Sequence, residues 1–360
     1  MPGTFREEYV DLYAVPRMNE TRLKHLLAHF EDPGRILSAK YAALRECPGI
    51  DEELARAVAS YRRSDETEGR IKAARDSGVQ TLGFRDPEYP ANLKDLAHMP
   101  PVLFARGAVV EEDRLAAAIV GTRRATHYGR QVAERFAQAF ALSGVTVVSG
   151  LARGVDTCAH KAALEAGGRT IGVLGCGIDV FYPPENRRLY DEVSASGAVL
   201  TEFAPGTDPL AMNFPKRNRV VSGLSRAIVA VEAGEKSGVL NTAAWAADQG
   251  RDVYAVPGPV TSPLSLGSNR LLLTGARPAT CPEDVIRDLG VSVQLEEKAK
   301  VDISAEEAPV MEALSADPLH VDEICETLGM PMATLLGVLM QLELKGVVRQ
   351  LPGKFFVKSA

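Results

Sequence analysis

The sequence predicts an α/β protein with a central, doubly wound, mainly parallel sheet, a small N-terminal helical domain and a C-terminal winged-helix domain. Three observations predict this fold. Between residues 115 and 258, short β-rich runs alternate with helical stretches, as parallel strands with helical crossovers do. Residues 11–63 carry apolar side chains at helical spacing. The pattern of the last fifty residues predicts three helices followed by a β-hairpin.

Composition and pattern divide the 360 residues into four segments. Residues 1–65 form the helical domain, and residues 66–290 form the sheet domain, beginning with a joining segment over 66–113. Four prolines within residues 83–104 predict little regular structure in that segment. Residues 291–308 are charged and without a clear period, so we expect a linker, and residues 309–360 form the winged helix.

The sheet is predicted from six strands. In chain order they are AAAIV, VTVVS, RTIGVLG, AVLTE, RAIVAVEA and DVYAVPG. Apolar runs this short, separated by helical stretches, are typical of parallel strands buried on both faces. Ligands of such sheets bind at the carboxyl ends of the strands, where the loops gather.

Charge and composition exclude several classes of protein. Lys and Arg (41) against Asp and Glu (47) give a net charge of −6, so a nucleic-acid site has to be a local patch. No apolar run approaches the roughly 18 residues of a membrane span, and the N-terminus lacks an export signal, so we expect a cytoplasmic protein with no membrane partner. Five scattered cysteines without a C-x-x-C pair predict neither a disulfide framework nor a metal site.

Glycines and cations gather where the predicted strands end. The first strand runs into Gly121-Thr122-Arg123-Arg124, and the second runs into a loop that contains Gly150 and Arg153. The loop before the fifth strand contains Phe214, Lys216, Arg217, Asn218 and Arg219, and Ser237-Gly238 begins the following helix. Glycine admits a ligand close to the backbone, and arginine offers a planar fork to phosphate. Glycines are common at strand ends in this fold class, but several cationic loops at one edge favour a nucleic-acid site.

Other chemistries fit the residues less well. Gly175-Cys176-Gly177 lacks the third glycine of a dinucleotide-binding turn, and no phosphate-binding loop of the Walker type is present, so no cofactor is predicted. Asp156, Cys158 and His160 lie too close together on one helix start to converge as a catalytic triad. His25 and His29 lack further metal ligands.

Residues 119–277 resemble the Rossmann-like domain of the DNA processing protein A family (DprA, also called Smf). The resemblance rests on IVGTRRATHYG, VVSGLARGVDTCAHKAAL, GGRTIGVLGCGIDVFYPPENRRLY, FPKRNRVVSGLS, SGVLNTAAWA and SNRLLLTGA. It implies a protein that binds single-stranded DNA without sequence preference, protects it and loads the RecA recombinase onto it in natural transformation. It also implies a homodimer, with other competence or single-strand-binding proteins as further partners.

The resemblance also suggests roles for individual residues. Arg123, Lys216, Arg217 and Arg219 match phosphate-binding positions, and Phe214 is available for base contact. The full predicted site consists of Gly121, Thr122, Arg123, Arg124, Gly150, Arg153, Phe214, Lys216, Arg217, Asn218, Arg219, Ser237 and Gly238. Leu271 and Leu272 are candidates for the dimer interface, although buried helix packing explains them equally well.

The flanking domains leave two interpretations each. The N-terminal module is similar to helix-hairpin-helix (SAM-like) modules of repair proteins, but Asp51 stands where their second glycine should be, which favours a structural or dimer-supporting role over DNA contact. The tail resembles the family's winged helix, yet residues 305–360 hold eight acids and four cations, a net charge of −4. Residues 332–344 contain no Lys or Arg, which favours protein contact, with weak DNA contact through Lys354.

An enzyme is the main alternative. A family with the same fold, similar to lysine decarboxylases, cleaves nucleoside monophosphates and carries Pro-Gly-Gly-x-Gly-Thr-x-x-Glu with a catalytic glutamate. The corresponding stretch here begins at Ser237 and places Trp245 at the glutamate's position. An indole cannot transfer protons as a carboxyl does, so we predict a binding protein without enzymatic activity.

Overall fold

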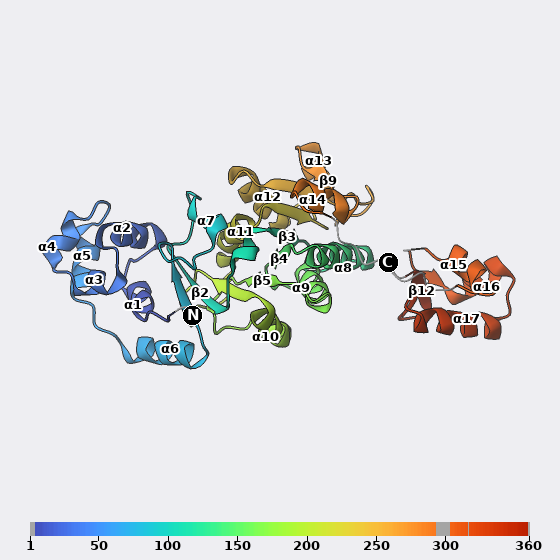
Figure 1. The fold of residues 1–360 in the computed structure, drawn as a ribbon, viewed down its shortest axis with the longest axis horizontal. Helices are drawn as coiled ribbons and strands as arrows, with labels where there is room; N and C mark the ends of the chain where they lie inside the picture. The colour runs from blue at the N-terminus through green and yellow to red at the C-terminus, as the bar shows by residue number, and fades with distance from the viewer. Residues whose placement is uncertain (1–3, 293–302, 316, 359–360) are drawn as a thin grey trace.

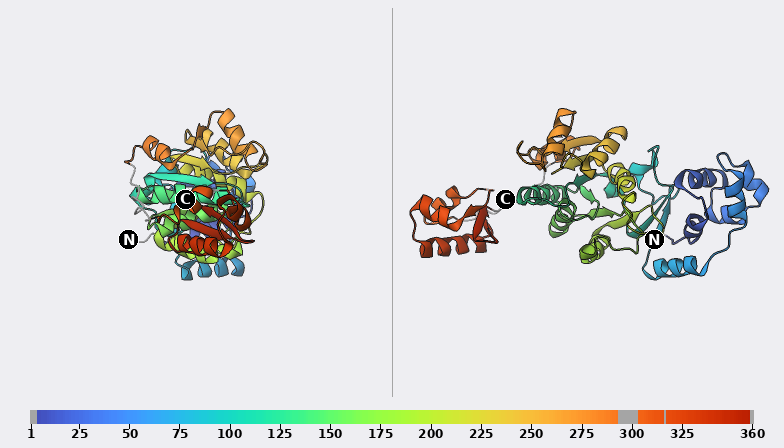
Figure 2. Two further views of the ribbon diagram at one scale, coloured as in Figure 1. Left: turned by 90° about the vertical axis from the view of Figure 1, so that its right-hand side faces the viewer. Right: turned by 180° about the vertical axis from the view of Figure 1, so that it is seen from behind.

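The computed structural model describes residues 4–292, 303–315 and 317–358. It has three parts in a row: the N-terminal helices at one end, the large sheet in the middle and the winged-helix domain at the other end (Figure 1). The same order is seen from behind in Figure 2. Most of the predicted linker, residues 293–302, lies outside the described residues.

Nine strands form one sheet within the described residues, in the order β1-β2-β6-β5-β4-β3-β7-β8-β9. The strands predicted from sequence are β3 (Ala116–Val120), β4 (Thr146–Ser149), β5 (Thr170–Val173), β6 (Ala198–Thr201), β7 (Ala227–Ala230) and β8 (Asp252–Ala255). All of these pair in parallel, which confirms the mainly parallel sheet. A two-residue strand, β9 (Arg277–Pro278), extends the sheet beyond β8.

The joining segment is more regular than its sequence predicted. It contains α6 (Asp65–Asp76), β1 (Gln80–Gly83), α7 (Ala91–Lys94), β2 (Val102–Gly107) and the short 3₁₀ turn η1 (Glu111–Arg114). Strand β2 pairs antiparallel with β6, and β1 pairs antiparallel with β2. The expectation of little regular structure was therefore wrong, because pairing with the sheet edge, rather than local sequence pattern, orders these strands.

Helices cover both faces of the sheet. The core of one face includes apolar side chains of α8 (His127–Leu142), α9 (Val155–Glu165) and α14 (Pro282–Asp288). The core of the other includes side chains of α7, α11 (Asn213–Leu224) and α12 (Gly238–Asp248), with α13 (Leu266–Leu273) packed at its edge. Helix α10 (Arg187–Ser196) follows the short 3₁₀ turn η2 (Pro184–Asn186) and lies beside α9, β5 and β6. This is the predicted doubly wound arrangement.

The N-terminal module packs directly against the sheet domain. It consists of α1 (Glu8–Ala14), α2 (Glu20–Phe30), α3 (Pro33–Ser38), α4 (Tyr41–Glu46) and α5 (Glu52–Ala59). One apolar core contains Leu23 and Leu54 of this module together with Phe104 of β2. Asp51 caps α5, because its carboxylate accepts a hydrogen bond from the backbone amide of Leu54 at 2.8 Å.

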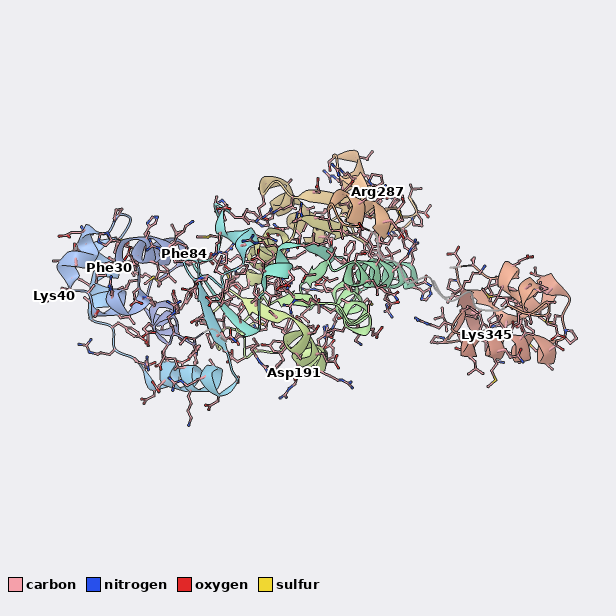
Figure 3. The ribbon with its side chains drawn as sticks, viewed as in Figure 1. Phe30, Lys40, Phe84, Asp191, Arg287 and Lys345 are labelled. Atoms are coloured by element: carbon pink, nitrogen blue, oxygen red, sulfur yellow. The ribbon has the colours of Figure 1, made fainter. Side chains whose placement is uncertain are left out.

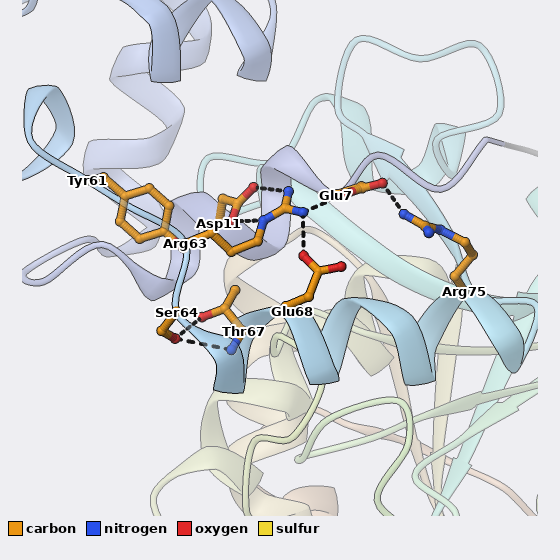
Figure 4. Close-up of polar contacts among 8 residues, drawn as sticks. All are labelled: Glu7, Asp11, Tyr61, Arg63, Ser64, Thr67, Glu68 and Arg75. Atoms are coloured by element: carbon orange, nitrogen blue, oxygen red, sulfur yellow. Dashed lines mark hydrogen bonds and ion pairs between the residues drawn. The ribbon is translucent and has the colours of Figure 1, made fainter.

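A cluster of ion pairs joins α1 to the start of α6 (Figure 4). Asp11 is buried, and its two carboxylate oxygens accept hydrogen bonds of 2.9 and 2.6 Å from the guanidinium of Arg63. The same guanidinium bonds Glu7 and Glu68, each at 2.8 Å. These contacts, led by the hydrogen bonds to Asp11, raise the pKa of Arg63. The cluster therefore fixes the chain where it leaves the N-terminal helices.

The C-terminal domain is the predicted winged helix. Helices α15 (Ala308–Ala313), α16 (Val321–Leu328) and α17 (Met332–Leu344) pack beside a small sheet of β10 (Leu319–His320), β12 (Phe355–Lys358) and β11 (Val348–Leu351). Among the described residues, no single helix is long and apolar enough to cross a membrane; α16 and α17 meet that length and composition only as a pair, bent by 113°.

Candidate nucleic-acid interface

A cavity lies at the carboxyl ends of β3, β4 and β5, beside the first turns of α11. Each of the three strands contributes through the loop that follows it, as expected for an open parallel sheet, and α11 contributes residues of its own first turns. The lining residues are Arg123, Gly150, Ala152, Arg153, Leu174, Gly175, Tyr182, Pro183, Phe214 and Arg217. The structure therefore brings together five of the predicted site residues from three separate segments of the chain.

Aromatic and cationic side chains stack around Phe214. The guanidinium carbon of Arg123 lies 5.0 Å from the centre of the Phe214 ring, and that of Arg217 lies 6.0 Å away. The ring of Tyr182 is 5.6 Å from the Phe214 ring at an interplanar angle of 41°. Flat faces beside positive charge suit a nucleic-acid strand, since the bases stack and the phosphates pair with cations.

Three exposed cations stand in the chain segments that contribute to this cavity. Arg123, Arg124 and Lys216 are exposed, and none of their side chains forms an ion pair with a carboxylate among the described residues. Arg153 differs, because its guanidinium pairs with Glu185 and both side chains are about half exposed. The unpaired cations are therefore free to meet an anion without first breaking an internal bond.

Arg217 lines the cavity but also has a structural role. It is buried, and its guanidinium donates hydrogen bonds to the backbone oxygens of Gly150, at 2.5 Å, and of Val173. Asp156, also buried, accepts bonds from the amides of Gly150 at 3.1 Å and Ala152 at 3.3 Å. Burial lowers the pKa of Arg217 and raises that of Asp156, and each charge opposes the shift of the other. This pair holds the loop after β4 in place.

Two glycines are required for these close approaches. A Cβ atom on Gly150 would lie 2.3 Å from Nη1 of Arg217, so any side chain there would displace the guanidinium. Gly154 has a φ of +75°, and its Cβ would lie 2.3 Å from the backbone oxygen of Thr122. The loops after β3 and β4 therefore pack backbone against backbone.

The basic segment after Phe214 lies on a helix, whereas the sequence predicted a loop. Arg219, on this helix α11, is buried and pairs with Glu202 and Glu20. It also donates to the backbone oxygen of His98 at 2.9 Å. The prediction of a phosphate contact is wrong for Arg219 in this structure, because its guanidinium is buried and already bonded. Burial raises the pKa of Glu202 to about 8.

The remaining predicted residues lie around the cavity rather than in it. Asn218 donates to the backbone oxygen of Gly238 at 3.4 Å, and Ser237 caps α12 by accepting from the amide of Val239 at 3.3 Å. In the loop after β3, Thr122 accepts a bond from the amide of Arg124 at 3.2 Å. Gly121 leaves no space for a Cβ beside the side chain of Val155.

Sequence reasoning missed Tyr182, Pro183 and Gly175. Tyr182 is exposed on the loop after β5, and its ring borders the cavity beside Phe214. The segment Phe181-Tyr182-Pro183-Pro184 lies within the stretch that resembles the DprA family, but it is not among the predicted site residues. The signal that could have identified Tyr182 is a pair of aromatic residues soon after the end of a strand.

The other candidate residues have structural environments. Leu271 and Leu272 of α13 are half-buried against the core, whereas Leu273 is 88% exposed. His160 is buried, bonds the hydroxyl of Thr170 at 2.7 Å, and has its pKa lowered by burial to about 3. Trp245 packs edge-on against His98 at 5.8 Å. No group of three or more His, Cys, Asp or Glu among the described residues is arranged to hold a metal ion.

Two sequence families match this chain. The model of the DNA recombination-mediator protein A family matches residues 80–290, and that of the DprA winged helix domain matches residues 294–354. Protein Smf of Synechocystis is 30% identical over 92% of this chain and 93% of that protein.

Two solved structures resemble the larger part of this chain. DNA processing protein A of Streptococcus pneumoniae has a TM-score of 0.68 and 29% identity, over 81% of this chain and all of that one. DNA processing protein A of Helicobacter pylori, whose structure was described for its single-stranded DNA binding mode, has a TM-score of 0.53 and 30% identity. That match covers 59% of this chain and 95% of the other.

Proposed function

Because the chain belongs to the DNA recombination-mediator protein A (DprA) family, we propose that it binds single-stranded DNA in the cavity around Phe214. The observation that carries the proposal is the exposed guanidinium of Arg123, which lies over the Phe214 ring, next to Tyr182, and has no carboxylate partner among the described residues. Arg124 and Lys216 are further exposed cations in the same two segments. The Helicobacter relative, studied for its single-stranded DNA binding, supports the same assignment of ligand.

In the proposed complex, cations position the strand and rings hold the bases. Arg123 and Lys216 contact backbone phosphates, and a base stacks beside Phe214 and Tyr182 in the cavity. Arg217 takes no direct part, since its guanidinium is bonded to backbone oxygens; it positions the loop after β4. Because phosphates and π-faces are common to all sequences, binding is insensitive to sequence and decreases as salt rises.

The wider role follows the family. We propose that the protein protects incoming single-stranded DNA and loads the RecA recombinase onto it in natural transformation, a function exercised in the cytoplasm. Other competence or single-strand-binding proteins are further partners in this proposal. The proposed active unit is a homodimer. Leu266 and Leu273 on α13, 46% and 88% exposed, are better candidates for its interface than Leu271 and Leu272.

We propose no enzymatic role. Trp245 occupies the position at which the nucleotide-cleaving family needs a glutamate, and its ring packs against His98. For the N-terminal module we propose a structural role, because Asp51 caps α5 and pairs with Arg22 at 2.5 Å. A carboxylate at that turn would repel a phosphate.

One titration tests the proposed ligand. The full chain is added to a fluorescently labelled oligo-dT, to a mixed-sequence single strand and to a duplex of equal length, and anisotropy is recorded. We expect both single strands to bind alike and more tightly than the duplex. Equal or tighter binding of the duplex, or no binding of the single strands, would contradict the proposal. RecA loading is tested separately, by the rate of RecA filament formation on single strands coated with a single-strand-binding protein.

A further inference from the structure

The winged-helix domain presents an apolar stripe that the proposed DNA site does not use. Met332, Leu336, Met340 and Leu344 follow one another at intervals of four residues along α17, so they share one side of the helix. They are 36%, 42%, 65% and 80% exposed. Helix α17 forms the lower edge of its domain in Figure 1, where no other element covers it from below.

The size of this stripe indicates an interaction surface. Its side chains expose on the order of a few hundred Å², the size at which an apolar patch on a soluble protein marks a binding site. The adjoining side of α17, with Leu335, Leu339 and Leu342, is already buried in the domain core. The helix is therefore apolar on nearly all sides, which is typical of a helix with neighbours on both sides.

The charge around the stripe indicates which partner it fits. Helix α17 carries no Lys or Arg, and its one charged residue, Glu343, lies seven residues after Leu336 and hence on the same side. The neighbouring helix α16 exposes Asp322, Glu323 and Glu326. Lys345, which follows α17, bonds the carboxylate of Glu307 at 2.6 Å. With a net charge of −4 over residues 305–360, the domain is complementary to a partner that carries positive charge beside an apolar side.

The same features argue against DNA on this helix. A helix that reads the major groove presents polar or basic side chains to the bases and phosphates. Here the stripe presents methionine and leucine, while the exposed cations Arg349 and Lys354 lie on β11 and in the hairpin turn after it. A phosphate placed on α17 would lose its water without gaining a partner.

We propose that the stripe on α17 docks a basic amphipathic helix of a partner protein. Leucine and methionine at intervals of four residues provide an apolar strip about 18 Å long, which accommodates three to four turns of a partner helix. The unbranched, polarisable methionines adapt to such a surface. The acidic domain attracts Lys or Arg beside the partner's apolar side, and Glu343, which accepts a hydrogen bond from the amide of Gln350 at 3.0 Å, is the acid on the stripe's own side of α17.

The test uses the full-length chain and a labelled synthetic helix of leucine and lysine, about four turns long. A peptide with glutamate in place of lysine, and one with the leucines at strand spacing, serve as controls. Anisotropy should show that the basic helix binds at least about tenfold more tightly than either control. Binding of all three peptides alike, or of none, overturns the proposal.

Variants locate the contact. Met340→Glu combined with Leu344→Glu should weaken binding of the basic helix by about tenfold or more, since both side chains are largely exposed and the substitution places charge in the apolar contact. Val260→Glu is the matched control, because Val260 is 83% exposed on the sheet domain and should leave binding unchanged. An unchanged thermal unfolding midpoint shows that each variant folds.

Two further outcomes would replace the proposed partner with another. If the double variant weakened binding of a duplex DNA to the same extent, α17 would be a nucleic-acid surface. If it changed the oligomeric state in light scattering, the stripe would contact a second copy of this chain. Either result would overturn the proposed docking of a basic helix.

Discussion

Replacing Arg123 by alanine isolates one phosphate contact of the proposed DNA site. Arg123 is exposed, lies 5.0 Å above the Phe214 ring and has no carboxylate partner among the described residues. Its removal breaks no internal ion pair and uncovers no buried charge. The fold should therefore be unaffected, and any loss of DNA affinity reports on the contact itself.

The size of the loss follows from the kind of contact. A hydrogen bond between a guanidinium and a phosphate contributes about 1.5–3 kcal/mol. Arg123→Ala should thus weaken binding of single-stranded DNA by about ten- to a hundredfold. Since one fewer phosphate is neutralised, the slope of log K against log salt should become shallower by about 0.7.

The assay is anisotropy of labelled oligo-dT and of a mixed-sequence strand at several salt concentrations. Arg287→Ala is the charge-matched control, because Arg287 (labelled in Figure 3) is largely exposed on α14 and pairs with Asp284 at 3.3 Å. We expect the control to bind like the wild type. A loss confined to one sequence, an unchanged affinity of Arg123→Ala, or an equal loss in both variants would refute the reasoning.

Three further predictions test separate parts of the structure. Tyr182→Ala should weaken single-strand binding by about 1–3 kcal/mol, whereas Tyr182→Phe should retain it, because stacking needs only the ring; equal losses in the two anisotropy titrations would argue against stacking. Arg63→Ala should lower the free energy of unfolding in urea by about 2 kcal/mol, because it leaves buried Asp11 without its charged partner. Arg56→Ala, which removes an exposed ion pair on α5, should lower the free energy of unfolding by about 0.5 kcal/mol or less. Similar losses in Arg63→Ala and Arg56→Ala would contradict this difference. Burial raises the pKa of Glu202 to about 8, above the value of this group in the unfolded chain. The contribution of protonated Glu202 to the stability of the fold is therefore lost as pH rises from about 5 to about 8. Glu202→Gln should make the urea unfolding midpoint depend less on pH over that range. An unchanged pH profile would show that Glu202 does not titrate there.

The central strands were predictable because their residues are apolar on both faces and are separated by regular helical stretches. Strands β1 and β2 were not, since the prolines and charges of the segments that flank them are typical of a loop. Both become strands by pairing at the sheet edge next to β6. Tertiary pairing, which local sequence does not record, determines their structure.

The candidate site was predictable to the level of segments, but not of individual side chains. The strand-end loops with Arg123 and Gly150 do meet at one cavity, as expected for parallel strands, and Phe214 reaches the same cavity from the first turn of α11. The sequence could not distinguish Lys216, which is exposed, from Arg219, which is buried against Glu202. Both stand in one basic run, and only the packing of Arg219 against Glu20 of the N-terminal module and Glu202 separates their roles.

Photo-crosslinking to DNA tests the location of the proposed site most directly. An oligonucleotide that carries halogenated uracils is bound to the full chain and irradiated, and the attached peptides are identified by mass spectrometry. We predict crosslinks at Tyr182 or Phe214, reduced in Arg123→Ala, together with none on α17. Crosslinks confined to the winged-helix domain or to the N-terminal helices would contradict the proposal that the sheet edge holds the strand.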